Sequence, residues 1–286
     1  MSRGVGILVL VLITVIWGTT FAIIKDALDT ISVPLLLALR FTLAALLLGW
    51  VRFERRSLGP AMVLGLLGFA GFTTQTIGLD LTSASKAAFI TGLSVILTPL
   101  LSAIWLRDRV APRAFLAAAV ALAGLGMMSL GGAGAIGAGD LWLMGTALAY
   151  AFYIVYLGHV ARDLPVLSLA GAQHWPMVLL AWVWALPHVG QLPEVPAETF
   201  AAIAYLALFA TALVAVLQTM AQRAVPAPLA ALIFLLEPVF AATFAFFLLG
   251  ERLGALGWLG GALVILAMLI SEMPLRLRGR RGTTSG

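Results

Sequence analysis

A glutamate and a proline stand side by side in the middle of a long apolar run. Glu237 is the only charged residue between 229 and 249, and Pro238 follows it directly. A carboxylate at that depth can bind a proton or a cation, and it should face the protein interior because a charge facing lipid is costly. Pro238 has no backbone donor and frees the carbonyl of Phe234, which predicts a hinge beside the carboxylate. Alternatively, Glu237 accepts hydrogen bonds from a neighbouring helix and Pro238 fixes a static kink.

Three further polar residues in apolar runs could contribute to the same site. Arg40 lies nine residues after the start of the run 31–51, at about the depth of Glu237, so the two could form an intramembrane ion pair. Alternatively, Arg40 anchors to a backbone carbonyl or reaches toward the lipid headgroups. Gln75 and Gln218 carry amides that need hydrogen-bond partners in hydrocarbon, and we therefore expect both in a polar interior.

These residues lie in a chain too apolar for a soluble globular protein. Of its 286 residues, 62% are hydrophobic and only 10% are charged, whereas about a quarter of the residues in soluble proteins are charged. Runs of roughly 20 apolar residues can span a bilayer, and a helix satisfies every backbone group internally. We predict an all-α integral membrane protein with ten transmembrane helices, at 4–24, 31–51, 60–79, 87–106, 111–130, 139–159, 165–187, 198–220, 229–249 and 254–273.

The basic residues divide unevenly between the connections of these helices. With the N-terminus inside, the inner segments hold 13 of the 17 Lys and Arg residues, the outer segments hold Lys25, Lys86 and Arg252, and Arg40 is the remaining one. Basic residues are retained on the cytoplasmic side, so both termini are predicted to be cytoplasmic. This asymmetry also accounts for the pI of about 10.2, and no nucleic-acid partner is expected.

The chain matches itself when it is shifted by 143 residues. The shift places "QTIGLDLTSASKAA" (75–88) over "QTMAQRAVPAPLAA" (218–231). Five helices in each copy would make the second copy enter the membrane from the opposite side, which is the inverted repeat of many secondary transporters. We predict a first five-helix repeat at 1–132, a second at 139–273, and a basic cytoplasmic tail at 274–286.

Repeat mates are expected to line one central cavity, since the two-fold axis of an inverted repeat lies in the membrane plane. Aromatic, hydroxyl and amide groups and one carboxylate would then surround a small amphipathic solute such as an amino acid. For each aromatic residue, packing or a lipid-facing position is the alternative. Pro99, in the first repeat, is predicted as a hinge counterpart of Pro238. The cavity candidates are Trp17, Thr20, Gln75, Ser94, Tyr150, Tyr153, Gln218, Phe234 and Glu237.

Four segments of the sequence resemble the drug/metabolite transporter superfamily, with two EamA-type repeats covering nearly the whole chain. They are "IWGTTF" (16–21), "LALRF" (37–41), "TSASKAAFITGLSVILTPLLSAIWLRDR" (82–109) and "LLEPVFAATFAFFLLGER" (235–252). The resemblance, nearest to the YddG type of bacterial amino-acid exporter, implies a secondary transporter of the bacterial inner (plasma) membrane. It also implies export of small amphipathic metabolites, above all amino acids, by alternating access.

Other functions and the energy source stay open on the sequence alone. A broad drug or cation exporter would also use a buried carboxylate to attract its substrate. An intramembrane enzyme acting on lipid-linked substrates could use Glu237 or His174 as a base, although enzymes need several convergent polar groups. One carboxylate allows proton exchange and facilitated diffusion equally. No cofactor or metal is expected, because the three histidines lack zinc-ligand spacing; the expected partners are the substrate and the bilayer, and we expect a monomer.

Overall fold

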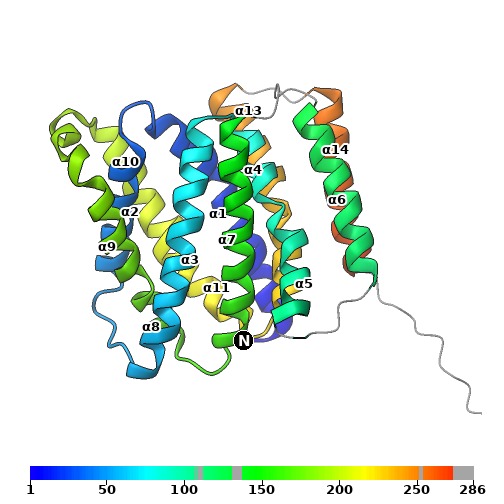
Figure 1. Ribbon diagram of the computed structural model, residues 1–286, viewed down its shortest axis with the longest axis horizontal. Helices are drawn as coiled ribbons and strands as arrows, with labels where there is room; N and C mark the ends of the chain where they lie inside the picture. Colours follow the sequence, from blue (N-terminus) through cyan, green and yellow to red (C-terminus); the bar gives the residue numbers. More distant parts are fainter. Residues whose placement is uncertain (106, 108–111, 131–136, 251–253, 273–286) are drawn as a thin grey trace, which may run out of the picture.

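The computed structural model describes residues 1–105, 107, 112–130, 137–250 and 254–272. These residues form helices that run side by side between two ends of the molecule (Figure 1), and they contain no β-strand. The predicted basic tail at 274–286 and Arg252 lie outside the described residues. The described helices are α1 (Arg3–Ala27), α2 (Val33–Leu47), α3 (Arg55–Asp80), α4 (Ala84–Thr91), α5 (Ser94–Trp105), α6 (Pro112–Leu130), α7 (Ala138–Val160), α8 (Val166–Ala172), α9 (His174–Ala185), the 3₁₀ helix η1 (Leu186–Glu194), α10 (Ala197–Ala207), the π-helical turn η2 (Leu208–Leu213), α11 (Val214–Gln222), α12 (Ala227–Phe234), α13 (Leu236–Leu249) and α14 (Ala255–Glu272).

Many of these helices are long and apolar enough to cross a membrane. The described residues contain seven such spans, namely Arg3–Ala27, Arg55–Asp80, Ala84–Trp105, Ala138–Val160, Val166–Leu192, Ala197–Gln222 and Ala227–Leu249. Shorter apolar helices include Val33–Leu47, Phe115–Gly124 and Ala255–Ala267. The predicted all-α membrane fold is therefore confirmed, while the count of ten spans stays a prediction.

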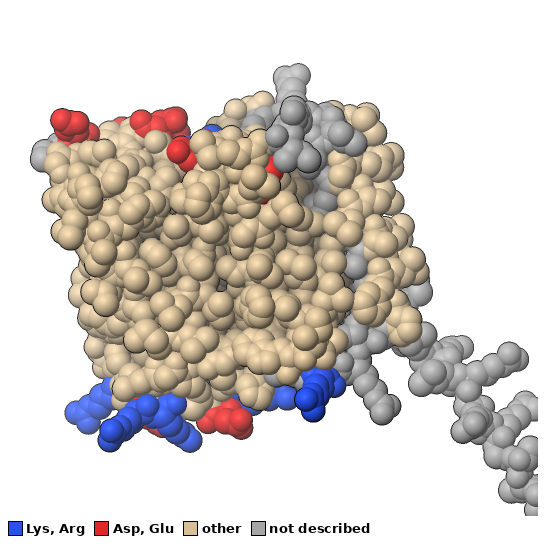
Figure 2. All heavy atoms as spheres, viewed as in Figure 1, with Lys and Arg blue, Asp and Glu red and all other residues tan. Residues whose placement is uncertain are grey.

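Charged and apolar side chains occupy different zones of the surface. Figure 2 shows uncharged side chains between two charged ends, with Lys and Arg gathered at the end where the N-terminus lies. That end carries Arg52, Arg55 and Arg56 before and at the start of α3, Arg162 after α7 and Arg223 after α11. An apolar belt between two polar ends is the surface expected of a protein that lies in a bilayer.

Four of the helical rods are interrupted near their middle. The chain passes from α4 to α5 through Gly92 and Leu93, from α8 to α9 at Gln173, and from α12 to α13 at Leu235, while η2 separates α10 from α11. The shift of 143 residues carries 92 to 235, so two of these breaks occupy matching positions. They also touch, because a Cβ at Gly92 would lie only 3.2 Å from Cγ of Pro238.

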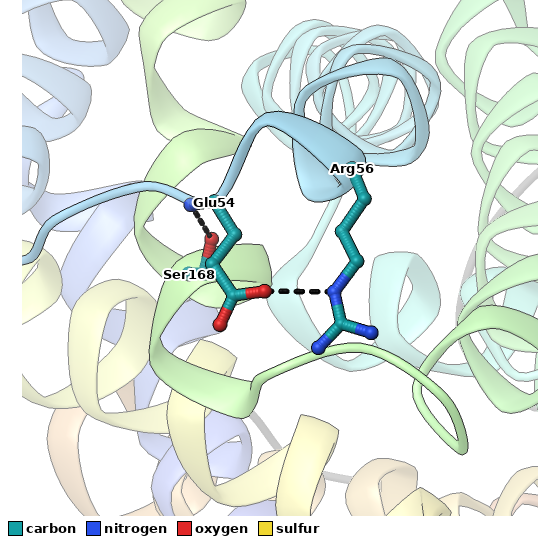
Figure 3. Close-up of polar contacts among 3 residues, drawn as sticks. All are labelled: Glu54, Arg56 and Ser168. Atoms are coloured by element: carbon teal, nitrogen blue, oxygen red, sulfur yellow. Dashed lines mark hydrogen bonds and ion pairs between the residues drawn. The ribbon is translucent and has the colours of Figure 1, made fainter.

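Polar contacts join the two halves of the chain at both ends of the molecule. At the basic end, the backbone N–H of Glu54 donates to Ser168 Oγ (2.8 Å), and Glu54 Oε2 accepts from Arg56 Nε at 2.7 Å (Figure 3). Near the other end, Lys86 Nζ at the start of α4 pairs with Asp140 Oδ2 of α7 at 2.8 Å, with side chains only 6% and 8% exposed. The exposed pair contributes little stability, whereas loss of one partner from the buried pair would leave a charge uncompensated.

Candidate functional site

One cavity between the helices is lined by both halves of the chain. All nine predicted cavity residues lie on its wall, and so does Arg40. Each of the four helix interruptions contributes to the wall, as discontinuous helices do at the midplane sites of secondary transporters. The lining residues from the interruptions are Thr91, Gly92 and Ser94; Gln173 and His174; Ala210 and Thr211; and Phe234 and Glu237.

Glu237 lies at the start of a new helix. The break at Leu235 makes Glu237 part of the first turn of α13, where the positive end of the helix dipole favours a carboxylate. The N–H of Leu235 bonds to the Leu232 carbonyl (3.1 Å), three residues back, and Pro238 offers no donor of its own. Within the described part of the chain, the Glu237 carboxylate has neither a hydrogen bond nor an ion pair, so it is available to a group inside the cavity.

Arg40 is held on the cavity wall by a hydroxyl and a ring. Its Nε donates to Thr211 Oγ1 (2.7 Å), and its guanidinium carbon lies 4.5 Å from the centre of the Phe72 ring. The ion pair predicted with Glu237 is absent from this structure because Thr211 and Phe72 hold the guanidinium instead. The alternative, an anchored Arg40, describes the structure better, although the anchor is a side-chain hydroxyl rather than a backbone carbonyl.

Two tyrosines on α7 connect the polar groups of the wall. Tyr150 donates to Gln75 Oε1 (3.2 Å), and Tyr153 donates to Gln173 Oε1 (2.8 Å). The Tyr150 hydroxyl lies within electrostatic reach of both Arg40 and Glu237. Tyr150 therefore stands between the two charged groups, and its position depends on a bond to a residue of the first half.

The second predicted amide is also partnered, as the cost of a bare amide requires. Gln218 Nε2 donates to Gln222 Oε1 (3.0 Å), and Gln222 Nε2 donates to the carbonyl of Ile154 (2.9 Å). This chain of bonds joins α11 to α7 beside the cavity. Gln218 thus has one amide group on the cavity wall and a defined orientation.

An aromatic pair forms the remaining side of the wall. Trp17 Nε1 donates to the Ala210 carbonyl (3.3 Å), and its ring lies 5.1 Å from that of Phe234. Thr20 donates to the Trp17 carbonyl (2.7 Å) and also faces the cavity. This side presents an apolar surface to an occupant, opposite in character to the charged groups.

The two predicted hinge prolines differ in their positions. Pro238 lies three residues after the break at Leu235 and packs against Gly92. Pro99 lies inside α5, and the interruption of that rod is at Gly92 and Leu93 instead. Beside the first-half break stands a residue without a side chain, and only the second-half break has a proline next to it.

Several wall residues were not among the predicted cavity residues. Phe72, Thr91, Gln173, His174 and Thr211 all line the cavity. Gln173 could have been found, since a shift of 133 residues carries 40 to 173. Phe72, Thr91 and Thr211 carry no signal that separates them from the other aromatic and hydroxyl residues of apolar helices.

Comparison with known proteins supplies the context for this cavity. A model of the EamA-like transporter family matches residues 4–130 and again residues 137–273. An uncharacterized transporter of Archaeoglobus fulgidus is 31% identical over 269 residues, which cover 92% of this chain and 84% of the relative. A protein of known crystal structure shares the fold with a TM-score of 0.70 at 18% identity, over 95% of this chain and 97% of that protein.

Proposed function

Because the chain belongs to the EamA-like transporter family, we propose that it is a secondary transporter that carries small amphipathic metabolites, above all amino acids, through the central cavity. The observation that carries the proposal is the unpartnered Glu237 carboxylate in a cavity built by both halves of the chain. A binding site at the junction of two repeats is the arrangement from which alternating access works.

The helix order supports two inverted repeats of five spans. The first would comprise α1, α2, α3, the rod α4–α5 and α6, and the second α7, the rods α8–α9, α10–α11 and α12–α13, and α14. The two final helices, α6 and α14, pack against each other (Figure 1). An odd number of spans in each repeat inverts the second copy relative to the first.

The contact between the two matching breaks supports a moving element at the cavity. The rods α4–α5 and α12–α13 meet where Gly92 packs on Pro238. Broken helices have fewer backbone hydrogen bonds to lose on bending, so rotation of one half against the other can concentrate there. Ser94 and Glu237 follow the two breaks and would move with them.

The charge asymmetry supports the direction of insertion. Basic residues gather at the end of the molecule that holds the N-terminus, and such residues are retained in the cytoplasm. In a bacterial inner membrane this orientation places both termini inside. The solute would then be taken from the cytoplasm and released outside.

Efflux from proteoliposomes tests the proposal. Purified protein is reconstituted into vesicles preloaded with labelled leucine, and release is followed with and without an imposed pH gradient. We expect protein-dependent release of chemically unchanged leucine, and Glu237→Gln should slow it or remove its response to the gradient because an amide does not titrate. The matched control is Glu198→Gln, which alters an exposed glutamate in the first turn of α10. Chemical conversion of a lipid-linked substrate, with no leucine release, would favour the enzyme alternative.

A cation exporter is the second candidate, and the same unpartnered carboxylate favours it. Such a transporter would release tetraphenylphosphonium from the same vesicles and leave leucine inside. Glu237→Gln would then abolish cation release in either the presence or absence of a pH gradient. Release of leucine without release of the cation supports the amino-acid proposal.

A further inference from the structure

A buried guanidinium on the cavity wall has an unused donor. Arg40 is 1% exposed, and its Nη1 has no hydrogen-bond partner although it is fully buried. A charged group in the middle of a membrane protein is costly unless it is paired or used. Within the described residues no carboxylate pairs with Arg40, so its charge is balanced only by the Phe72 ring and a hydroxyl.

The hydroxyl that orients Arg40 belongs to an irregular helix turn. Thr211 lies in η2, and its Oγ1 donates to the carbonyl of Leu206, five residues earlier (2.8 Å), while accepting from Arg40 Nε. π-helical turns are rare and occur frequently at functional sites. The wider turn gives Thr211 a carbonyl to donate to, which leaves its oxygen lone pairs directed at the guanidinium.

The two charged residues of the cavity belong to different groups of helices. Arg40 lies on α2, which packs against α9 and η2, whereas Glu237 lies on α13, which packs against α1 and α4. The two charges share one cavity without neutralising each other. A solute that carries both a carboxylate and an ammonium group matches this separation, whereas a simple cation leaves the guanidinium unpaired.

We propose that Arg40 is the residue that binds the carboxylate of the transported solute, with Thr211 as the residue that positions its guanidinium. This inference rests on the proposed function, because it assumes that the solute occupies the cavity. Arg40 Nη1 is the donor left free for the solute, since Nε is committed to Thr211. The apolar Trp17–Phe234 side would receive the side chain of the solute.

Competition with carboxyl-modified leucine analogues tests the assignment. Uptake of labelled leucine into leucine-loaded vesicles is measured against unlabelled leucine, leucinamide, 3-methylbutylamine and 4-methylpentanoate. For the wild-type protein we expect leucine to compete at least roughly tenfold better than leucinamide, the order expected for loss of one charged hydrogen bond. Arg40→Gln should bring the two within about twofold of each other, since the amide cannot offer a charged donor, and Arg40→Lys should retain part of the preference.

Thr211→Val separates positioning from folding. The variant keeps the shape of the threonine and removes the acceptor for Arg40 Nε, so the preference for leucine should fall several-fold. Thr219→Val is the matched control, because Thr219 is a fully buried threonine of the same rod that does not line the cavity. A purely structural role would lower transport of all compounds equally and leave their ratio unchanged. If the Arg40 variants do not fold, the Thr211 and Thr219 pair decides the question.

The compound panel distinguishes the two proposals. Competition by 4-methylpentanoate but not by the amines would support the role of Arg40 and contradict an amino-acid substrate. Equal competition by leucine and leucinamide in the wild-type protein would overturn the role of Arg40 while leaving the proposed function standing. Transport of 3-methylbutylamine alone would contradict both.

Discussion

Gly71 in α3 allows the ring of Tyr150 to lie against the helix backbone. A Cβ at position 71 would overlap Cε1 and Cδ1 of that ring. Gly71→Ala should therefore push Tyr150 toward the cavity and break its 3.2 Å bond to Gln75. Overpacking a core by one methyl group costs about 1–3 kcal/mol, whereas replacing glycine by alanine within a helix contributes about 0.5–1 kcal/mol of stability.

Gly145→Ala isolates the overpacking cost. Gly145 lies on α7 at the same interface with α3, and its added Cβ would sit 3.6 Å from Thr74 Cγ2, an ordinary contact. Both variants gain the same helix preference, so the difference in their unfolding free energies should be about 1–3 kcal/mol. Unfolding in detergent measures it, and leucine efflux reports the displaced ring. A Gly71→Ala protein as stable and as active as Gly145→Ala would refute this account of the Tyr150 wall.

Three further predictions concern the halves, the amide and the orientation. Asp140→Asn should lower the unfolding free energy by about 3 kcal/mol because it strips the carboxylate charge from buried Lys86, and adding Lys86→Met should recover much of that loss in the same unfolding assay; no recovery would contradict the mutual dependence of the pair. Gln218→Leu should slow leucine efflux with little change in detergent stability, and wild-type efflux would remove this amide from the site. An impermeant thiol reagent should reach a cysteine at Arg56 only from the cytoplasmic side and one at Gly137 only from the opposite side, with reversed labelling contradicting the proposed orientation.

Depth in the membrane could be predicted from the sequence, but direction around each helix could not. The apolar runs place Arg40 and Glu237 at similar depths, and both line the cavity as that depth allows. Their separation depends on how each helix is rotated about its axis, which packing decides. The bond from Arg40 to Thr211 further requires the π-helical turn, and nothing in "LFATAL" departs from ordinary helical sequence.

The helix breaks show the same division. Pro238 marked the break of α12–α13 because a residue without a backbone donor weakens the preceding turn. The matching break of α4–α5 has no proline beside it, and Pro99 drew the prediction to a position inside α5. Gly92 is one of 29 glycines, and its importance follows from its contact with Pro238 on the other half, a tertiary contact that no local pattern contains.

The repeat gave the sequence its greatest reach. Shifts of 143 and 133 residues paired residues that the structure brings to one cavity, including Ser94 with Glu237 and Trp17 with Tyr150. Symmetry transfers a position from one half to the other without any knowledge of helix rotation. It could not supply Phe72 or Thr211, because these residues were not singled out in either half.

A single cysteine at Ser94 offers the most direct test of the central claim that the solute occupies this cavity. The chain has no cysteine of its own, so Ser94→Cys carries one thiol, on the cavity wall beside the helix break. The measurement is the rate at which a small maleimide labels that thiol in membranes with and without leucine, compared with a cysteine at exposed Glu198. The account predicts that leucine slows labelling at position 94 several-fold and leaves position 198 unchanged; equal rates at position 94 with and without saturating leucine would contradict it.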